Sequence, residues 1–269
     1  MKRTNTKSNY TVSIVGSGNV ATHLALALHG AGHSIVQVLS REYDHASLLA
    51  SRVGAEPVDK AGMLRPGADF YLLAVADDAL YDLGLDLHFP ESIILHTSGA
   101  TPAEVLNRVS HHYGVVWSPQ SFLRDIAMDY RHLPICIEGS DDRTADEIER
   151  LCSSFSDCVY RLDFAQRRWA HLAAVLVSNF GNAINALAQQ TMHDHGMDPE
   201  MLRPLAEQTL NKWNFGNLRA QQTGPAIRHD EKTLSVHRRL LADQPQLLEL
   251  YNIMTKIIQH PEKTRTTGQ

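Results

Sequence analysis

A glycine-rich turn near the N-terminus carries the strongest chemical signal in the sequence. Gly16-Ser17-Gly18-Asn19-Val20-Ala21 has the spacing G-x-G-x-x-A, and the apolar run Thr11–Val15 leads directly into it. In a dinucleotide site the first glycine permits a tight turn, the second lets the backbone approach a pyrophosphate, and the small last residue lets helix and strand pack closely. The free amide groups of the following helix then bind the phosphates. We therefore expect Gly16, Ser17, Gly18, Asn19 and Val20 to bind a dinucleotide cofactor.

The end of the second predicted strand indicates which dinucleotide this is. Ser40-Arg41-Glu42 follows the apolar run Ile35–Leu39. An NADP site places an arginine or a serine here to bind the 2′-phosphate, whereas an NAD site places an acid that accepts the ribose hydroxyls. Ser40 and Arg41 therefore favour NADP, with NADPH preferred over NADH. Glu42 leaves NAD open as the alternative, and Arg41 could also be an ordinary surface charge.

Two further strand ends are expected to face the same cleft, because ligands of doubly wound folds bind beyond the carboxyl ends of the strands. Ala76 and Asp77 follow one strand, where the cofactor ribose commonly lies, although Asp77 could equally cap the next helix. Ser98 follows another strand and is expected to donate a hydrogen bond where nicotinamide and substrate meet. A nucleophilic role for Ser98 is not favoured, since the pattern G-x-S-x-G is absent around it.

Residues 171–189 are predicted to form one long helix with two contrasting faces. At roughly 100° per residue, apolar side chains fall on one side and uncharged polar side chains on the other. A solvent face would normally carry Lys and Glu, so we expect a helix buried on both sides, with the polar stripe facing a substrate cleft or a twin subunit. The apolar face comprises Leu172, Leu176, Phe180, Ala183, Ile184 and Leu187, and the polar stripe comprises His171, Ser178, Asn179, Asn182, Asn185 and Gln189.

His171 is the best candidate for a general acid, although a helical histidine is often purely structural. Reducing a carbonyl requires a proton for the new alkoxide, and imidazole titrates near neutral pH. Asn179 could hold the carbonyl or carboxylate of the substrate. The sequence has 15 histidines, but the close groups His111-His112 and His193-x-His195 lack the i, i+4 spacing that helical metal sites favour, so no metal is expected.

The elements that must position these residues form two regions. Six short apolar runs of strand length alternate with helical stretches up to about residue 160, which is typical of a βαβ series and a parallel sheet covered on both faces. After Leu162 only helical patterns follow, broken near Pro199, Gly224 and Pro245. We expect a disordered lead-in over residues 1–9, an α/β doubly wound Rossmann domain over 10–162, and an all-α domain over 163–269 that begins at Asp163 as a helix cap. The strand runs are Thr11–Val15, Ile35–Leu39, Phe70–Val75, Ile93–His96, Val115–Trp117 and Ile135–Glu138.

Composition excludes several classes of function. The 269 residues are 43% hydrophobic and 20% charged, with a net charge of −5, which argues against a nucleic-acid partner. Basic pairs such as Arg167-Arg168 are expected to be solvated surface. Three cysteines without ligand spacing fit the reducing cytoplasm. Residues 170–192 lack charged side chains, but the amides within them favour a buried helix over a membrane span.

Several of these segments together resemble a known family. They are Gly16–Ala21, Ser40-Arg41, His171–Val175, Ser178-Asn179, and Thr223–Asp230 with Thr233 and His237 after it. The chain is similar to bacterial proteins that pair a Rossmann-like NADP-binding domain with a helical C-terminal domain of unknown function. That group resembles a branch of the 6-phosphogluconate dehydrogenase-like superfamily, whose members include pyrroline-5-carboxylate reductase, deazaflavin-dependent NADP reductase, β-hydroxyacid dehydrogenases and ketopantoate reductase.

The resemblance implies an NADP site at the glycine-rich turn, a homodimer formed through the helical domain, and ketopantoate as the best specific substrate. One feature of this chain differs from the pattern of the related enzymes. Ketopantoate reductases and β-hydroxyacid dehydrogenases carry a Lys–Asn pair on this helix, whereas here His171 or Val175 stands in place of the lysine and Asn179 in place of the asparagine. Arg228 could pair with a substrate carboxylate, or it could join Asp230 and His237 in a network that holds two helices together.

Hydride transfer between NADPH and a small 2-oxo acid or related carbonyl is the leading hypothesis. His171 would be the acid, with Asn179 and Arg228 orienting the substrate. One alternative is a dinucleotide-binding sensor or scaffold without catalysis, which the missing lysine favours. A second is an imine reductase resembling pyrroline-5-carboxylate reductase, in which the substrate can arrive already protonated.

Overall fold

The computed structural model describes residues 9–260, with the side chains of residues 83–86 outside that description. The lead-in predicted for residues 1–9 therefore lies, except for Asn9, outside the described part of the chain. The chain divides into two compact units between Ala183 and Ile184. The domain boundary expected between residues 162 and 163 stays a prediction.

The first unit is built on one eight-stranded sheet with the order β3-β2-β1-β4-β5-β6-β7-β8. All six predicted strands are present, within a few residues at each end, and the doubly wound fold class is confirmed. Sequence reasoning missed the two edge strands β3 and β8, which are three residues long and lack an apolar run. The strands are β1 (Thr11–Val15), β2 (Ser34–Leu39), β3 (Glu56–Val58), β4 (Phe70–Leu73), β5 (Ile93–His96), β6 (His112–Trp117), β7 (Ile135–Gly139) and β8 (Val159–Arg161).

One strand pair corrects the expectation of a parallel sheet. β6 and β7 pair antiparallel, with Val115 opposite Glu138 and Trp117 opposite Cys136. The connection between them contains only the short helix η3 (Tyr130–His132), so no crossover helix returns the chain to the other end of the sheet. β8 then pairs parallel to β7. The chain therefore leaves β8 at the end of the sheet opposite to the carboxyl ends of β1, β4, β5 and β6.

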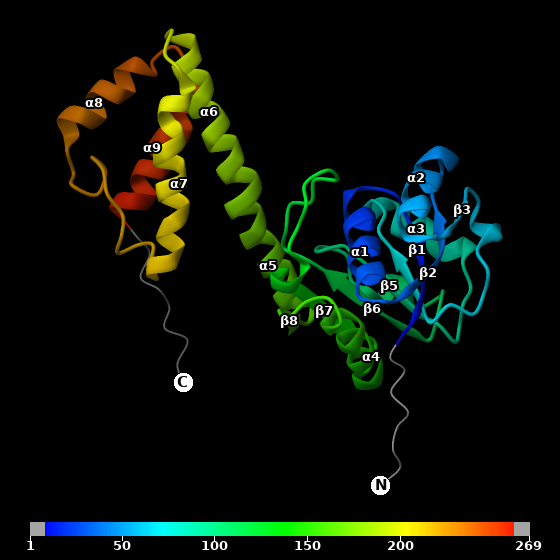
Figure 1. The fold of residues 1–269 in the computed structure, drawn as a ribbon. Coiled ribbons are helices and arrows are strands. Elements are labelled where there is room, and N and C mark those ends of the chain that lie inside the picture. The colour runs from blue at the N-terminus through cyan, green and yellow to red at the C-terminus, as the bar shows by residue number, and fades with distance from the viewer. Residues whose placement is uncertain (1–8, 261–269) are drawn as a thin grey trace. The chain divides into compact units, whose positions relative to one another are not determined.

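Helices cover both faces of this sheet (Figure 1). Alternate side chains of each strand point to opposite faces: Val12 and Ile14 belong to one apolar cluster, whereas Val15 belongs to the other. α1 (Asn19–Gly30), α2 (Tyr43–Val53) and α4 (Asp142–Ser153) contribute to the first cluster, and α3 (Asp77–Asp86) with η2 (Ala103–Leu106) contributes to the second. A short helix, η1 (Ala61–Met63), follows β3.

α5 (Phe164–Val175) covers the sheet near β6 and β7, where Ala170 and Ala174 pack against the buried cluster that includes Trp117 and Cys136. The predicted cap is confirmed: the Asp163 carboxylate accepts from the Gln166 amide at 2.8 Å, and the Gln166 side chain accepts from the Asp163 amide at 3.1 Å. The helix continues through a π-helical turn, η4 (Leu176–Phe180), into α6 (Gly181–Asp194).

The expectation that this long helix is buried on both sides is wrong for the single chain. Leu172 is 47% exposed, and Leu176 and Phe180 are each 54% exposed. The polar residues Ser178 and Asn179 are exposed as well. The first unit therefore leaves Leu172, Leu176 and Phe180 uncovered, although Ala174 of the same stretch packs against the sheet.

The second unit is helical, and the breaks predicted near Pro199, Gly224 and Pro245 are confirmed. Within this unit His237 of α8 hydrogen-bonds the Tyr251 hydroxyl of α9 at 2.8 Å. No helix among the described residues is long and apolar enough to cross a membrane. After α6, the elements are η5 (Pro199–Leu202), α7 (Arg203–Asn211), η6 (Lys212–Phe215), α8 (Glu231–Leu240) and α9 (Pro245–Gln259).

Candidate functional site

The glycine-rich turn opens onto a cavity of about 900 Å³ at the carboxyl ends of β1, β2 and β4. This is the edge at which doubly wound folds bind nucleotides. The volume lies within the range of ligand pockets, which run from roughly 300 to 1,000 Å³. Six of the residues expected to bind the cofactor line the cavity, namely Gly16, Ser17, Gly18, Ser40, Arg41 and Ala76.

The turn itself accepts only glycine at its first position. Gly16 has a φ of 114°, and a Cβ atom there would lie 2.2 Å from the Ala74 carbonyl oxygen. The Gly16 amide also donates to the Leu39 carbonyl at 2.7 Å, which ties the turn to the end of β2. Gly18 lies at the N-cap of α1, where a Cβ atom would meet nothing within 4 Å. The missing side chain leaves the backbone there accessible to a phosphate, so the turn fits a dinucleotide.

Asn19 uses its side chain for a different purpose. Its amide donates to the Phe122 carbonyl at 2.9 Å, and Arg124 donates from Nη2 to the Ser17 carbonyl at 2.9 Å. The segment after β6 therefore lies against the glycine-rich turn. Asn19 and Val20 do not line the cavity, so only their backbone amides at the start of α1 remain for a phosphate.

The residues expected to distinguish NADP from NAD also line the cavity. The Ser17 and Ser40 hydroxyls lie 2.8 Å apart. Arg41 and Glu42 both line the wall, as do His45 and Asp59, which the sequence did not identify. One cation, Arg41, and two acids, Glu42 and Asp59, therefore line the same part of the cavity. Their balance of charge determines whether the site favours the 2′-phosphate of NADP or the free ribose hydroxyls of NAD.

Asp77 and Ser98 contact each other. Asp77 begins α3, and its carboxylate accepts a hydrogen bond of 2.8 Å from the Ser98 hydroxyl. The Ser98 oxygen also accepts from the amides of Ala100, at 3.1 Å, and Thr101, at 2.9 Å. Ser98 is only 6% exposed, and its hydroxyl points into its own loop. Neither residue lines the cavity, but together they join the loop after β5 to the start of α3.

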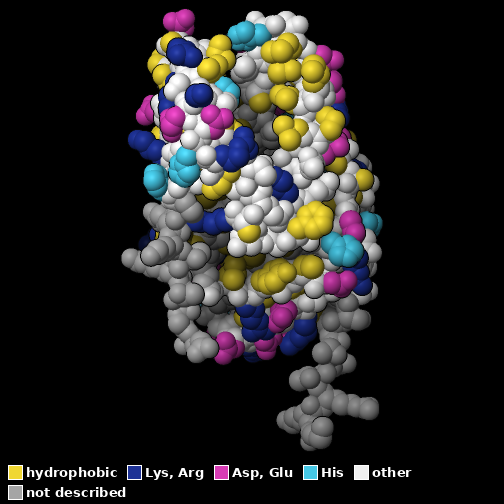
Figure 2. Space-filling view, turned by 90° about the vertical axis from the view of Figure 1, so that its left-hand side faces the viewer, with side chains coloured by type: hydrophobic (Ala, Val, Ile, Leu, Met, Phe, Trp, Pro, Cys, Tyr) yellow, Lys and Arg dark blue, Asp and Glu magenta, His cyan; other side chains and the backbone are white. Residues whose placement is uncertain are grey.

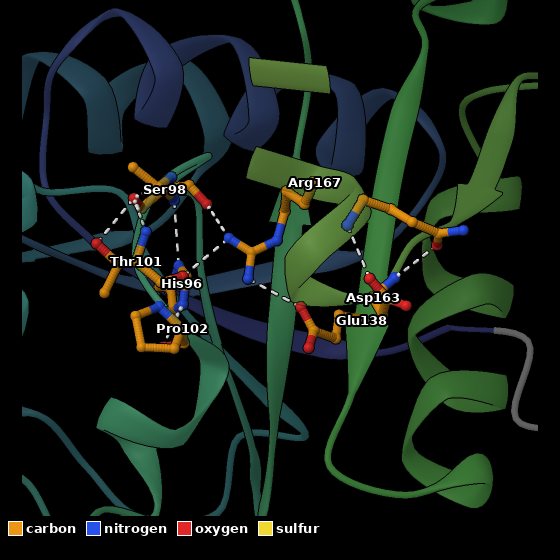
Figure 3. A network of polar contacts seen from close by, with 9 residues as sticks. His96, Ser98, Thr101, Pro102, Glu138, Asp163 and Arg167 are labelled. Atoms are coloured by element: carbon orange, nitrogen blue, oxygen red, sulfur yellow. Dashed lines mark hydrogen bonds and ion pairs between the residues drawn. The ribbon is translucent and has the colours of Figure 1, made fainter. Parts of the chain in front are cut away.

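A buried arginine holds this loop from the other side (Figure 3). Arg167 of α5 donates from Nη1 to the carbonyls of Ser98, at 2.7 Å, and Thr101, at 2.8 Å. Its Nη2 pairs with Glu138 of β7 at 2.8 Å. The Arg167 side chain is fully buried, which corrects the expectation that Arg167-Arg168 is a solvated surface pair. Only Arg168 is exposed.

His96 belongs to the same network and has an unusual environment. Its Nδ1 accepts from the Ser98 amide at 3.1 Å. Burial, and secondly the positive charge of Arg167, lowers the pKa of His96 to about 4. His96 is therefore neutral near pH 7, and it is not suited to deliver protons there.

His171 lies at the carboxyl ends of β5 and β6. Its ring centroid is 5.7 Å from that of Trp117, with the rings inclined at 76°. A Cβ atom on Gly99 would come within 2.7 Å of His171 Cδ2 and 2.9 Å of Trp117 Nε1. The imidazole therefore rests on the Gly99 backbone, and its partly exposed position leaves it accessible to a ligand. The structure thus brings His171 to the loop that also contains Ser98.

Asn179 and Arg228, the other two predicted catalytic residues, lie outside α5. Asn179 is exposed in the π-helical turn η4 of the first unit, and π turns inside helices frequently occur at functional sites. Arg228 is an exposed residue of the second unit and makes no ion pair with any described residue. No hydrogen bond or ion pair joins Arg228 to Asp230, but the Arg228 charge contributes to lowering the pKa of the Asp230 carboxyl. The largest causes of that lower pKa are the hydrogen bonds that the Asp230 carboxylate accepts from the Thr233 hydroxyl and amide.

No group of three or more potential metal ligands occurs among residues 9–260 with described side chains. The functional residues that sequence reasoning missed are Arg167, Glu138, Arg124, His45 and Asp59. Of these, only His45 could have been anticipated, since it lies shortly after the predicted strand that ends at Leu39, whereas Asp59 follows the unpredicted strand β3. The other three have partners far away along the chain.

Comparisons with known proteins agree with this geometry. Residues 11–97 match the family model for NADP oxidoreductase, coenzyme F420-dependent, and residues 133–258 match a domain of unknown function, DUF2520. A solved Bacteroides fragilis structure, inferred to be an NADP oxidoreductase, is 34% identical, with a TM-score of 0.87, and the match covers 94% of this chain and 99% of that chain. None of the curated proteins compared with the chain matches it.

More distant structures share the fold. A reductive aminase from Aspergillus terreus, in complex with NADPH and ethyl-5-oxohexanoate, has a TM-score of 0.70 at 17% identity, covering 94% of this chain and 95% of that chain. A pyrroline-5-carboxylate reductase from Coxiella burnetii has a TM-score of 0.60 at 15% identity, covering 93% of this chain and 98% of that chain. At these identities the likeness concerns the fold.

Proposed function

The chain belongs to the family of NADP oxidoreductases in which a coenzyme F420-dependent NADP oxidoreductase module is followed by DUF2520, and we propose that it reduces a small carbonyl or imine with NADPH. The observation that carries this proposal is the juxtaposition within one unit of the nucleotide cavity and His171. The glycine-rich turn and the imidazole both lie at the carboxyl ends of the central parallel strands.

The cavity residues fit the cofactor. Backbone amides after Gly16 and Gly18 would hold the pyrophosphate, and Arg124, through its bond to the Ser17 carbonyl, adds a positive charge beside the turn. Ser40 and Arg41 would hold the 2′-phosphate, with Ala76 against the ribose. When bound, NADPH supplies a hydride. Asp77 and Ser98 would support the nicotinamide end through the loop they join, rather than by direct contact.

His171 would supply the proton. Reduction adds a hydride to the carbonyl carbon and a proton to its oxygen, and a histidine close to the oxygen can deliver that proton near neutral pH. The position of His171 on Gly99, beside the end of β6, fits this role. Asn179 would orient the substrate from the π-helical turn. Arg228, in the second unit, stays a candidate for binding a carboxylate.

A titration of intrinsic fluorescence with NADPH and NADH tests the cofactor assignment. We expect tight NADPH binding and weaker NADH binding, and we expect Arg41→Asp to lose most of the NADPH affinity. Arg52→Asp makes the same charge change on α2, outside the cavity, and should bind NADPH like the unmodified chain. If neither nucleotide binds, or if Arg41→Asp binds NADPH unchanged, the assignment of the 2′-phosphate site fails.

Imine reduction is the second candidate, and the distant similarity to a reductive aminase and a pyrroline-5-carboxylate reductase favours it. An imine can arrive already protonated, so that its reduction places less demand on a side-chain acid. The two candidates differ in their response to His171→Gln. That change should abolish carbonyl reduction but leave most of an imine reductase activity.

Ketopantoate remains the specific carbonyl substrate to test, and none of the three solved structures reported above is a ketopantoate reductase. A panel of 2-oxo acids, ketopantoate among them, and cyclic imines, each monitored by NADPH oxidation, would decide between the classes. A non-catalytic sensor remains the alternative from a different class. NADPH binding with no turnover over the whole panel would favour it.

We also propose that the chain forms a homodimer through exposed apolar surface. Leu172, Leu176 and Phe180 lie exposed along α5 and η4, and further apolar side chains are exposed on the helical unit (Figure 2). A second copy of this chain would cover them. Sedimentation should show a dimer that Phe180→Glu dissociates, whereas Tyr81→Glu, on the exposed surface of α3, should leave the dimer intact. A monomer at all concentrations would contradict this proposal.

A further inference from the structure

We propose that Arg167 is a positioning residue for His171, because it fastens the helix that carries His171 to the loop on which the imidazole rests. The proposal deepens the proposed function and rests on it, since His171 matters only if it donates the proton. Its evidence is the buried network around the guanidinium.

The Arg167 guanidinium binds two neighbouring elements, the loop after β5 and strand β7. Nη1 donates to two carbonyls of the loop after β5, those of Ser98 and Thr101, and Nη2 pairs with Glu138 of β7. The Arg167 side chain is fully buried and the Glu138 side chain is 16% exposed. A buried guanidinium is costly unless it is paired and hydrogen-bonded, as this one is at both terminal nitrogens. These contacts therefore determine where the loop and α5 meet.

The same helix face carries His171 to the active edge of the sheet. Arg167 and His171 are four residues apart, so their side chains leave α5 from one face, about 6 Å apart along the axis. In the sheet, Glu138 lies opposite Val115, and Trp117 is two residues further along β6, which is about 6.6 Å. The two distances match. Once Arg167 is paired with Glu138, His171 is level with Trp117, where the structure places it.

The loop after β5 provides the backbone surface against which the His171 imidazole packs. Gly99 lies between Ser98, whose carbonyl accepts from Arg167, and Thr101, whose carbonyl does the same. The Gly99 backbone is so close to His171 that a Cβ atom would be 2.7 Å from the ring. Arg167 therefore joins the helix that carries His171 to the loop that contains Gly99, and Figure 3 shows its bonds to Ser98 and Thr101 on that loop.

Only arginine has the geometry for this arrangement. Its planar fork presents donors in fixed directions, whereas a lysine is a single point charge that cannot reach two carbonyls and a carboxylate in the same way. Arg167 and the next residue, Arg168, both have their guanidinium groups over the Phe164 ring, at 5.3 Å and 5.0 Å from its centroid, but Arg168 is exposed. It therefore provides a matched control for removing a cation from this turn of α5.

Tryptophan emission can report the contact without any substrate. Trp117 is buried beside His171, whereas Trp169 and Trp213 are exposed and can be replaced by phenylalanine in the full chain. The emission of an indole depends on the polar groups packed against it, so His171→Gln should change the emission of Trp117 at constant pH. The emission step is this difference, measured by introducing His171→Gln into each variant in turn.

The test variant is Arg167→Met combined with Glu138→Gln, which removes both charges and leaves neither buried alone. We expect it to lose most of the emission step, and to show a lower kcat with an unchanged KM for NADPH. Arg168→Met should keep both the step and the kcat. Arg167→Lys should restore only part of the step, because lysine cannot reproduce the fork.

Two outcomes would overturn the proposal. One is a folded double variant that binds NADPH and keeps the full His171-dependent step. The other is an unmodified chain in which His171→Gln changes no emission, since the imidazole then does not rest against Trp117. Failure of the proposed reductase function looks different: the step and its dependence on Arg167 persist, but no carbonyl or imine is turned over.

Discussion

The substitution Gly99→Ala tests whether His171 acts where the structure places it. A methyl group at Gly99 would lie 2.7 Å from His171 Cδ2, 2.8 Å from His171 Cγ and 2.9 Å from Trp117 Nε1. These atoms belong to rings packed at the end of the sheet, so they cannot simply swing aside. To reach ordinary van der Waals contact, the imidazole must move by ~0.7 Å relative to the loop.

The size of the effect follows from this displacement. Overpacking of one methyl group typically costs about 1–3 kcal/mol of unfolding free energy. A misplacement of about 1 Å at a reacting group can cost on the order of 100-fold in rate, so we expect a 10- to 100-fold lower kcat. NADPH affinity should change little, because Gly99 does not line the nucleotide cavity.

The assay combines NADPH oxidation at saturating substrate, NADPH titration and urea unfolding. Gly30→Ala is the matched control, since a Cβ atom there, at the end of α1, would meet nothing within 4 Å. It should leave turnover unchanged. The reasoning is refuted if Gly99→Ala turns over substrate at the normal rate while retaining its stability, because the loop and imidazole would then not be in contact.

Three further predictions concern stability. Asp163→Ala removes the capping box at the start of α5 and should cost about 1 kcal/mol of unfolding free energy in urea, with Asp243→Ala, which caps no helix, as control. Glu138→Gln leaves the buried Arg167 guanidinium without its counter-ion and should cost about 3–5 kcal/mol, a loss that the double variant with Arg167→Met should partly recover. Burial holds the pKa of His96 at about 4 in the folded chain, below the value of ~6.5 expected in the unfolded chain. The unfolded state therefore binds the proton first, so about 3 kcal/mol of stability present above pH ~6.5 should be lost as the pH falls toward 4. Urea unfolding over this range should show a smaller loss in His96→Gln, and an equal slope in both proteins would contradict the assignment.

The sequence predicts the elements whose signals are local. The strand before Gly16, the helix after it and the cap at Asp163 all depend on neighbouring residues, and the structure contains them. β3 and β8 could not be predicted in this way, since Glu56–Val58 and Val159–Arg161 are strands only because a longer strand lies beside each. The direction of β7 was not predictable either, because an apolar run does not show which way its partner runs.

The same difference between local and long-range signals decides which residues of the candidate site the sequence could predict. The cavity residues from Gly16 to Arg41 lie within one β-α-β unit, and their spacing identifies them. Arg167 was misjudged because a pair of arginines on a helix is usually solvated, and nothing near it in the sequence indicates that Glu138 is its partner. Asn19 was expected to contact the cofactor, but its side chain holds the segment at Phe122, which is 103 residues away.

The reversal of β7 has a consequence for function that links these observations. If β7 ran parallel to β6, the helix after β8 would start at the carboxyl edge and run away from the cofactor cavity. Because β7 and β8 run the other way, α5 starts at the opposite edge and rises toward the carboxyl ends, with Arg167 level with Glu138 and His171 level with Trp117. The antiparallel pair thus brings a histidine from the far end of the unit to the edge where the glycine-rich turn binds its nucleotide.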